Sequence, residues 1–144
     1  MKALGVDYGL SRIGLAVSDE SARVACPIGV VTPRTRDPRE VAALLGNIAR
    51  ERGVALIVIG FPRNMDGTPG SLGGEIVELA RALESEGFPV ELWDERLSTV
   101  EAERALIEGN LSRQKRRRVI DKVAACLILQ GYLDRLERPS SRDD

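Results

Sequence analysis

The sequence predicts an α/β fold in which a mixed, five-stranded sheet carries helices on both faces. Three strand-like segments follow one another at the start of the chain, over 3–9, 13–18 and 26–32, as in an antiparallel meander. Strand-like and helix-like segments then alternate. The segment 55–60 is apolar throughout, which is typical of a central parallel strand that is covered on both faces. Together these observations favour a layered arrangement of one sheet between helices.

The first strand, over 3–9, is apolar except for one carboxylate, Asp7. Alternation of side chains places Val6 and Tyr8 on one face and Asp7 on the other. The link 9–12 is short enough for a hairpin, so Asp7 lies near the end of a strand that turns back on itself. An ionised Asp in a central strand is costly unless a cation meets it, which makes Asp7 a candidate functional residue.

Capping signals mark the helices. Asp37 at the N-cap and Pro38 at the first helical position begin a helix that Gly53 ends. Ser98 and Glu101 form a second capping box. Further elements are expected as helices over 75–86, 98–108 and 119–136, and as a strand over 90–94.

Length and composition limit the classes of protein. The 144 residues suit one domain, which we assign to 1–136, and the charged tail 137–144 is expected to be disordered. No segment resembles a signal peptide or a membrane-spanning run, so we expect a cytoplasmic protein with no leader and no membrane partner. The absence of histidine excludes Ser-His-Asp triads and His-ligated zinc. A net charge of -1 means that any nucleic-acid surface must be a local patch.

Three carboxylates stand where the predicted fold can bring them together. Asp7 is on the first strand, Glu95 follows the last strand, and Asp121 lies near the start of the last helix on its apolar stripe. Mg²⁺ and Mn²⁺ prefer such oxygen ligands and support phosphodiester cleavage without histidine. Each residue alone also has an ordinary explanation as a turn, solvated or helix N-terminal acid. Spacing alone leaves these alternatives open.

Two segments are candidates for holding a phosphate backbone. The first is the basic run before Asp121, because cations beside carboxylates offset the repulsion of phosphate, although such a run is also typical of a solvated surface. Its candidate nucleic-acid-binding residues are Arg113, Lys115, Arg116, Arg117 and Arg118, with Lys122 following. The second is the Gly-rich loop 60–71, which contains Asn64 and whose backbone N–H groups can meet phosphate, although it is equally typical of a flexible connector.

Four motifs occur in one order along the chain. They are Val6–Gly9 with Arg12–Ala16, Gly60–Pro62 with Asn64–Gly67, Asp94–Thr99, and Asp121–Ala125 with Ile128–Gln130. In these motifs the chain resembles the YqgF family, pre-16S ribosomal RNA nucleases that are also described as Holliday-junction-resolvase-like. The resemblance extends to about Leu136. Resolvases proper usually carry a fourth carboxylate on the last helix, where this chain has Ala124 and Ala125.

The resemblance implies a ribonuclease H-like fold, a cytoplasmic bacterial protein and metal-dependent phosphodiester cleavage. It implies that Asp7, Glu95 and Asp121 are the catalytic and metal-binding triad. We therefore hypothesise a nuclease that uses Mg²⁺ or Mn²⁺, with Arg12 and the basic run holding phosphates and Asn64 bordering the substrate. The resemblance alone suggests precursor ribosomal RNA as the substrate.

Three alternatives remain open from the sequence. The first is a Holliday-junction resolvase acting on branched DNA rather than structured RNA, which would need two active sites and hence a homodimer rather than a monomer. The second is a module that binds nucleic acid or a ribosome-assembly partner without cutting. The third is an ATP-using phosphotransferase, whose architecture needs two such domains where 144 residues supply one.

Overall fold

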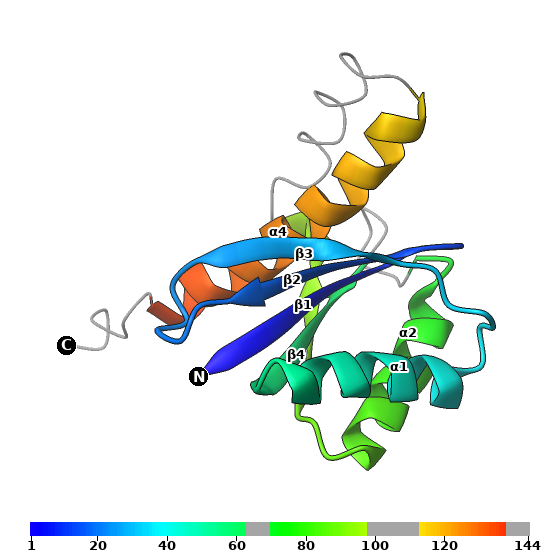
Figure 1. Ribbon diagram of the computed structural model, residues 1–144, viewed down its shortest axis with the longest axis horizontal. Coiled ribbons are helices and arrows are strands. Elements are labelled where there is room, and N and C mark those ends of the chain that lie inside the picture. Colours follow the sequence, from blue (N-terminus) through cyan, green and yellow to red (C-terminus); the bar gives the residue numbers. More distant parts are fainter. Residues whose placement is uncertain (63–69, 98–112, 138–144) are drawn as a thin grey trace.

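The chain folds around one five-stranded sheet with the strand order β3-β2-β1-β4-β5. The computed structural model describes residues 1–62, 70–97 and 113–137 (Figure 1). β1 pairs with β2 and β2 with β3 in antiparallel fashion, whereas β1–β4 and β4–β5 are parallel. The predicted mixed sheet is therefore confirmed. The strands are β1 (Lys2–Tyr8), β2 (Ile13–Ser18), β3 (Ala25–Val31), β4 (Val54–Phe61) and β5 (Val90–Asp94).

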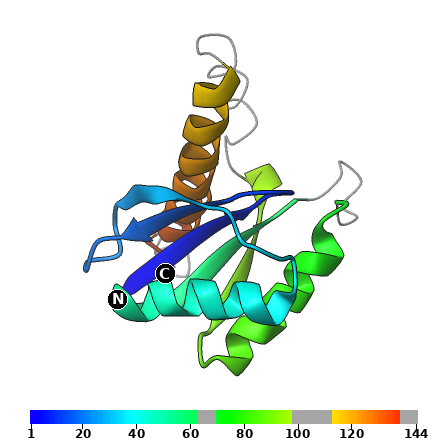
Figure 2. The ribbon, with the colours of Figure 1, turned by 45° about the vertical axis from the view of Figure 1, so that its right-hand side comes forward.

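Helices cover both faces of the sheet, as predicted. Helices α1 (Pro38–Glu51) and α2 (Gly73–Ser85) pack side by side on one face, and α4 (Arg113–Glu137) lies on the other (Figures 1 and 2). A short 3₁₀ turn, η1 (Glu95–Leu97), follows β5 directly. Among the described residues, none of the helices combines the length and the hydrophobicity of a membrane span.

The alternation of β1 divides the molecule into two cores. Leu4, Val6 and Tyr8 belong to the core under α1 and α2. Ala3 belongs to the second core, which α4 closes with residues such as Ala125. Asp7 therefore points to the α4 face, as the sequence predicts.

The predicted cap of α1 is confirmed. The carboxylate of Asp37 accepts a hydrogen bond from the backbone N–H of Arg39 at 3.1 Å, and Pro38 is the first helical residue. Beyond the end of α1, Gly53 has φ +69°, in the left-handed region that glycine adopts at little cost.

The last helix begins earlier than expected. We predicted a start near Val119, but α4 begins at Arg113, so the basic run forms its first turns and Asp121 lies about two turns inside. Arg, Lys and Gln are good helix formers, and this propensity explains the longer helix. The helix expected over 98–108 and the tail expected to be disordered over 138–144 lie outside the described residues.

Candidate active site

Asp7 is a buried carboxylate near the end of β1. It is 7% exposed and lies opposite Gly14 in the β1–β2 pair. On the other side of β1, Val6 pairs with Ile59 of β4, so Gly60, the next residue, lies beside Asp7. Asp7 is thus flanked on the α4 face by two glycines, which leave room above the strands.

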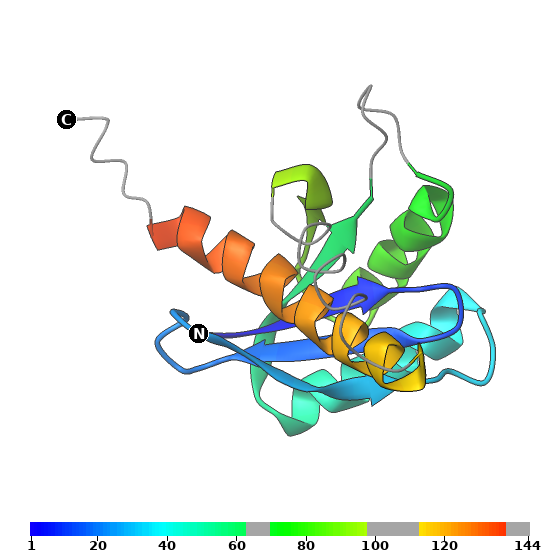
Figure 3. The same ribbon diagram turned by 90° about the horizontal axis from the view of Figure 1, so that it is seen from above.

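Asp121 occupies the space above the first of these glycines. Figure 3 shows α4 running across the strands of the sheet. A Cβ atom added to Gly14 would overlap the backbone carbonyl of Asp121, so only glycine allows α4 to come this close. Ala124 and Ala125, further along α4, are buried in the core between α4 and the sheet. The small residues on both elements therefore bring Asp121 next to the strand position opposite Asp7.

Glu95 reaches the space above the second glycine. It follows β5 in the 3₁₀ turn η1, and its Oε2 would lie 2.9 Å from a Cβ atom placed on Gly60. The neighbouring Asp94 has a different role, because its carboxylate contacts Nη2 of Arg96 at 2.7 Å and accepts the backbone N–H of Arg96 at 2.9 Å. The turn at the end of β5 therefore directs Glu95, rather than Asp94, toward the end of β1.

The backbone thus carries the three predicted acids to the same end of the sheet, with Asp7 on the strand between the positions beneath Asp121 and Glu95. In donor type they fit a hard divalent cation, since all are carboxylates presented by separate elements of the fold. Their separation is larger than coordination requires: among the residues that the structure describes, no three acidic, Cys or His side chains are close enough to hold one metal ion.

Arg12 lies beside this group of acids. Its Nε is 3.0 Å from Oδ2 of Asp121, and the two side chains are 28% and 19% exposed. The geometry is that of an ion pair rather than of an aligned hydrogen bond. Arg12 is predicted from the sequence to bind phosphate, and its contact with Asp121 is one that the sequence does not reveal.

The structure describes some of the other predicted nucleic-acid-binding residues. Lys122 is exposed on α4, one residue after Asp121. The segment from Arg113 to Arg118 forms the first turns of α4, which project beyond the sheet (yellow in Figure 2). Asn64 lies outside the described residues. The basic run is therefore continuous with the helix that carries Asp121.

A polar cluster on the opposite face supports the same end of β1. The hydroxyl of Tyr8 and Nε of Arg36 both donate to Oε1 of Glu75, each at 2.9 Å. The Arg36 guanidinium also lies over the Tyr8 ring, 4.9 Å from its centroid, and donates to the backbone carbonyls of Gly9 and Leu10. The cluster joins the β1–β2 turn to the first turn of α2.

Two pKa shifts follow from this cluster. Burial, and then the hydrogen bond to Glu75, raise the pKa of Tyr8. The hydrogen bond from Tyr8, opposed by burial and reinforced by Arg36, lowers the pKa of Glu75. The sequence does not reveal this cluster, because Tyr8, Arg36 and Glu75 lie 28 to 67 positions apart and no local pattern connects them.

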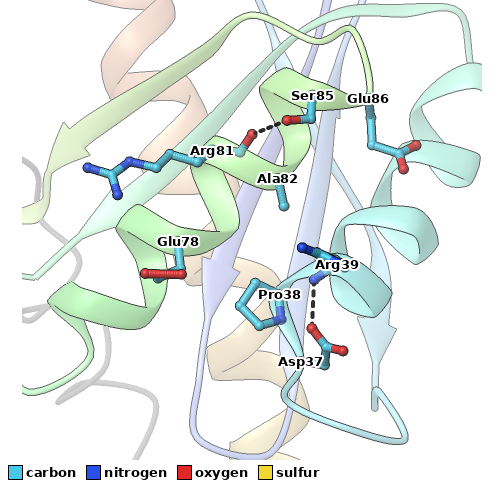
Figure 4. Close-up of a pocket in the computed structure, with 8 residues that line it drawn as sticks. All are labelled: Asp37, Pro38, Arg39, Glu78, Arg81, Ala82, Ser85 and Glu86. Atoms are coloured by element: carbon cyan, nitrogen blue, oxygen red, sulfur yellow. Dashed lines mark hydrogen bonds between the residues drawn. The ribbon is translucent and has the colours of Figure 1, made fainter.

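One cavity lies away from the acids. It has a volume of about 510 Å³ and opens between the start of α1 and the length of α2 (Figure 4). Its lining includes Arg39, Glu78 and Arg81. Because α1 and α2 cover the face opposite to α4, this cavity is separate from the candidate active site.

The sequence has close relatives along almost its whole length. One protein from Clostridium novyi is 46% identical over 135 residues, covering 93% of this chain and 98% of its own. A relative from Moorella thermoacetica is 47% identical over 137 residues, covering 94% and 96%. Both carry the name "Putative pre-16S rRNA nuclease".

Solved structures show the same fold at low sequence identity. RuvC from Thermus thermophilus, in complex with a Holliday junction substrate, superposes with a TM-score of 0.59 at 15% identity, covering 95% of this chain and 97% of its own. The fowlpox virus Holliday junction resolvase gives a TM-score of 0.56 at 13% identity, covering 94% and 99%. The fold is therefore ribonuclease H-like, as in these RuvC-like resolvases.

A family assignment follows from the sequence as a whole. Residues 1–135 match the RuvX family, which is described as Holliday junction resolvase. This match confirms the resemblance to the YqgF family that the four motifs indicate. The chain belongs to the RuvX family.

Proposed function

We propose that this protein is a metal-dependent nuclease that hydrolyses phosphodiester bonds in processing the 5′ end of precursor 16S ribosomal RNA in the cytoplasm. The observation that carries the proposal is the position of Asp7 between two glycines, with Asp121 above Gly14 and Glu95 above Gly60. The names of the relatives at 46% and 47% identity support the reaction and the choice of RNA.

The three acids have distinct structural supports. Asp7 is fixed by its strand pairing with Gly14, Glu95 by the turn after β5, and Asp121 by the packing of α4 on the sheet. Bound Mg²⁺ or Mn²⁺ would activate water and stabilise the negative charge on the leaving oxygen.

The basic residues have the complementary role of holding the substrate. Cations near the N-terminus of a helix interact unfavourably with its macrodipole, which offsets part of the helix propensity of the basic run. These cations can bind backbone phosphates, which is a role that the stability of α4 does not require. We assign this role to Arg12, Lys122 and the basic run, and place Asn64 at the border of the substrate. The basic run comprises Arg113, Lys115, Arg116, Arg117 and Arg118.

The proposal is tested by cleavage of a labelled precursor ribosomal RNA fragment and of a four-way DNA junction, each with Mg²⁺, Mn²⁺ or chelator. Asp7→Asn is compared with the wild type, and Glu78→Gln, an exposed acid on α2, is the matched control. We expect metal-dependent cutting of the RNA that Asp7→Asn abolishes and Glu78→Gln retains. Equal cutting by Asp7→Asn would overturn the role of the acids.

Junction resolution is the second candidate, because the RuvX family is described as Holliday junction resolvase. A junction cutter needs two active sites and therefore a homodimer, whereas a processing nuclease can act as a monomer. Preference for the four-way junction, together with a dimeric mass in light scattering, would favour this candidate. Metal-independent binding without cutting of either substrate would favour the non-cleaving binding module.

A further inference from the structure

The ion pair between Arg12 and Asp121 lies at the edge of the candidate active site. Nε of Arg12 and Oδ2 of Asp121 are 3.0 Å apart, and both atoms are buried although their side chains are partly exposed. Water screens such a pair less than it screens a pair on the open surface. Their attraction is therefore strong enough to affect what else binds to the Asp121 carboxylate.

We propose that Arg12 is a displaceable counter-charge, which competes with a divalent cation for Asp121 and, once displaced, binds a substrate phosphate. This inference rests on the proposed function, in which Asp121 is a metal ligand. It adds a regulatory step to that function: the protein would hold substrate firmly only when its metal ion is in place.

Electrostatics makes the two cations compete. A guanidinium has five N–H donors and no acceptor, so it cannot share the Asp121 carboxylate with a divalent ion without charge repulsion. The same planar group matches phosphate, to which it can donate two parallel hydrogen bonds. A single movement of Arg12 would therefore relieve the repulsion and supply a phosphate ligand.

The Arg12 side chain can move while the backbone of the hairpin stays in place. The N–H of Gly9 donates to the carbonyl of Arg12 at 2.9 Å, and Tyr8 pairs with Ile13 immediately beyond. Arg36 donates to the carbonyl of Gly9 from the other face at 3.3 Å. The backbone of Arg12 is thus held on both sides, whereas its partly exposed side chain has several rotatable bonds.

Thermodynamic linkage gives the expected effect of Arg12 on the affinity for the metal. If Arg12 weakens metal binding by some factor, the metal weakens the Arg12–Asp121 contact by the same factor. Removal of the positive charge at residue 12 should therefore tighten metal binding to the free protein. An increase in affinity would be unusual, because most substitutions in a metal site weaken the affinity for the metal.

Calorimetric titration of the full chain with MnCl₂ tests the inference without any substrate. We expect Arg12→Gln to bind Mn²⁺ at least about fivefold more tightly than the wild type, because fivefold is the upper end for an exposed ion pair and this pair is partly buried. Arg12→Lys retains the charge and should remain near the wild type. Arg39→Gln, an arginine of α1 on the far face, removes the same charge away from the acids and is the matched control.

Four outcomes decide the matter. Tighter binding by Arg12→Gln alone supports the inference. Unchanged or weaker binding by Arg12→Gln overturns it, and so does equal tightening by Arg39→Gln, which would indicate a general effect of net charge. Absence of Mn²⁺ binding by the wild type overturns the inference and the proposed metal site together. If the wild type binds metal and cuts RNA, failure of the Arg12 result leaves the proposed function intact.

A second measurement serves if Arg12→Gln does not fold. In ¹⁵N-labelled wild-type protein, the Nε–Hε resonance of Arg12, assigned by its loss in Arg12→Lys, should shift during titration with diamagnetic Mg²⁺. The shift should follow the same binding curve as calorimetry. A resonance that stays in place while Mg²⁺ binds would show that Arg12 keeps its partner, and would overturn the inference.

Discussion

The backbone carbonyl of Asp121 lies directly over Gly14, the residue that pairs with Asp7 across β1 and β2. One contact between helix and sheet therefore sets both the packing of α4 and the distance between two of the three acids. Gly60 has the corresponding position on the other side of Asp7, beneath Glu95 and Ile128. A side chain at position 14 would meet the backbone of Asp121, whereas one at position 60 would meet the side chains of Ile128 and Glu95. We therefore expect substitution of Gly14 to affect mainly stability, and substitution of Gly60 to affect mainly activity.

Gly14→Ala should destabilise the protein. The added methyl group would overlap the Asp121 backbone, which cannot rotate away, so α4 must shift. Overpacking of this kind costs about 1–3 kcal/mol of the free energy of unfolding. Urea unfolding measures it, and Gly74→Ala is the control, because its methyl group would meet nothing within 4 Å. Equal stability of the two variants would contradict the close approach of α4.

Gly60→Ala should lower activity more than stability. Its methyl group would meet the flexible ends of two side chains, Ile128 Cδ1 at 2.5 Å and Glu95 Oε2 at 2.9 Å. Both can move, but Glu95 would then leave its place beside Asp7. A displacement of about 1 Å costs on the order of 10²-fold in rate, which single-turnover cleavage of the RNA substrate measures. Wild-type activity in a folded Gly60→Ala protein would exclude Glu95 from the reaction.

Tyr8→Phe should reduce stability in a pH-dependent way. It removes the hydrogen bond to Glu75, worth about 0.5–1 kcal/mol at a partly exposed site. Because Glu75 has a pKa below its ordinary 4.5 in the folded protein, its contribution is present above about pH 4.5 and is lost as the pH falls through the lowered pKa. Urea unfolding at pH 7 and pH 3 should therefore show a stability difference that shrinks at the lower pH. A constant difference would indicate that the Glu75 charge is not involved.

The basic run should contribute to RNA binding through the release of counterions from the phosphate backbone. Arg116→Gln is expected to weaken RNA binding for all sequences alike and to reduce the slope of log K against log salt by about 0.7–0.9. Fluorescence anisotropy over a series of KCl concentrations measures the slope. Arg39→Gln should leave the slope unchanged, because α1 covers the other face of the sheet. If both variants changed it equally, the basic run would have no special role.

The sequence predicts the elements of this fold better than its tertiary contacts. Alternation in β1 correctly separates Val6 from Asp7, and the cap at Asp37 correctly begins α1. These features depend on residues that are neighbours in the chain. The early start of α4 is hard to predict, because a run of cations is typical both of a solvated surface and of a helix.

The contacts of the candidate site depend on long-range packing. The sequence identifies Asp7, Glu95 and Asp121 as candidate metal ligands. The roles of Gly14 and Gly60 depend on α4 and η1, which lie above them only in the folded protein. Arg36 shows no local signal, because its partners come from β1 and α2. Such contacts join elements that only the folded sheet brings together.

A crystal soaked with Mn²⁺ and measured for anomalous scattering tests the central claim most directly. We predict a strong anomalous peak between Asp7, Glu95 and Asp121, with oxygens of Asp7 and at least one of the other two at about 2.1 Å, near the distances that Mg²⁺ adopts. A peak bound elsewhere, or no peak at millimolar Mn²⁺ with the three side chains ordered, would contradict the claim that these acids form a metal site.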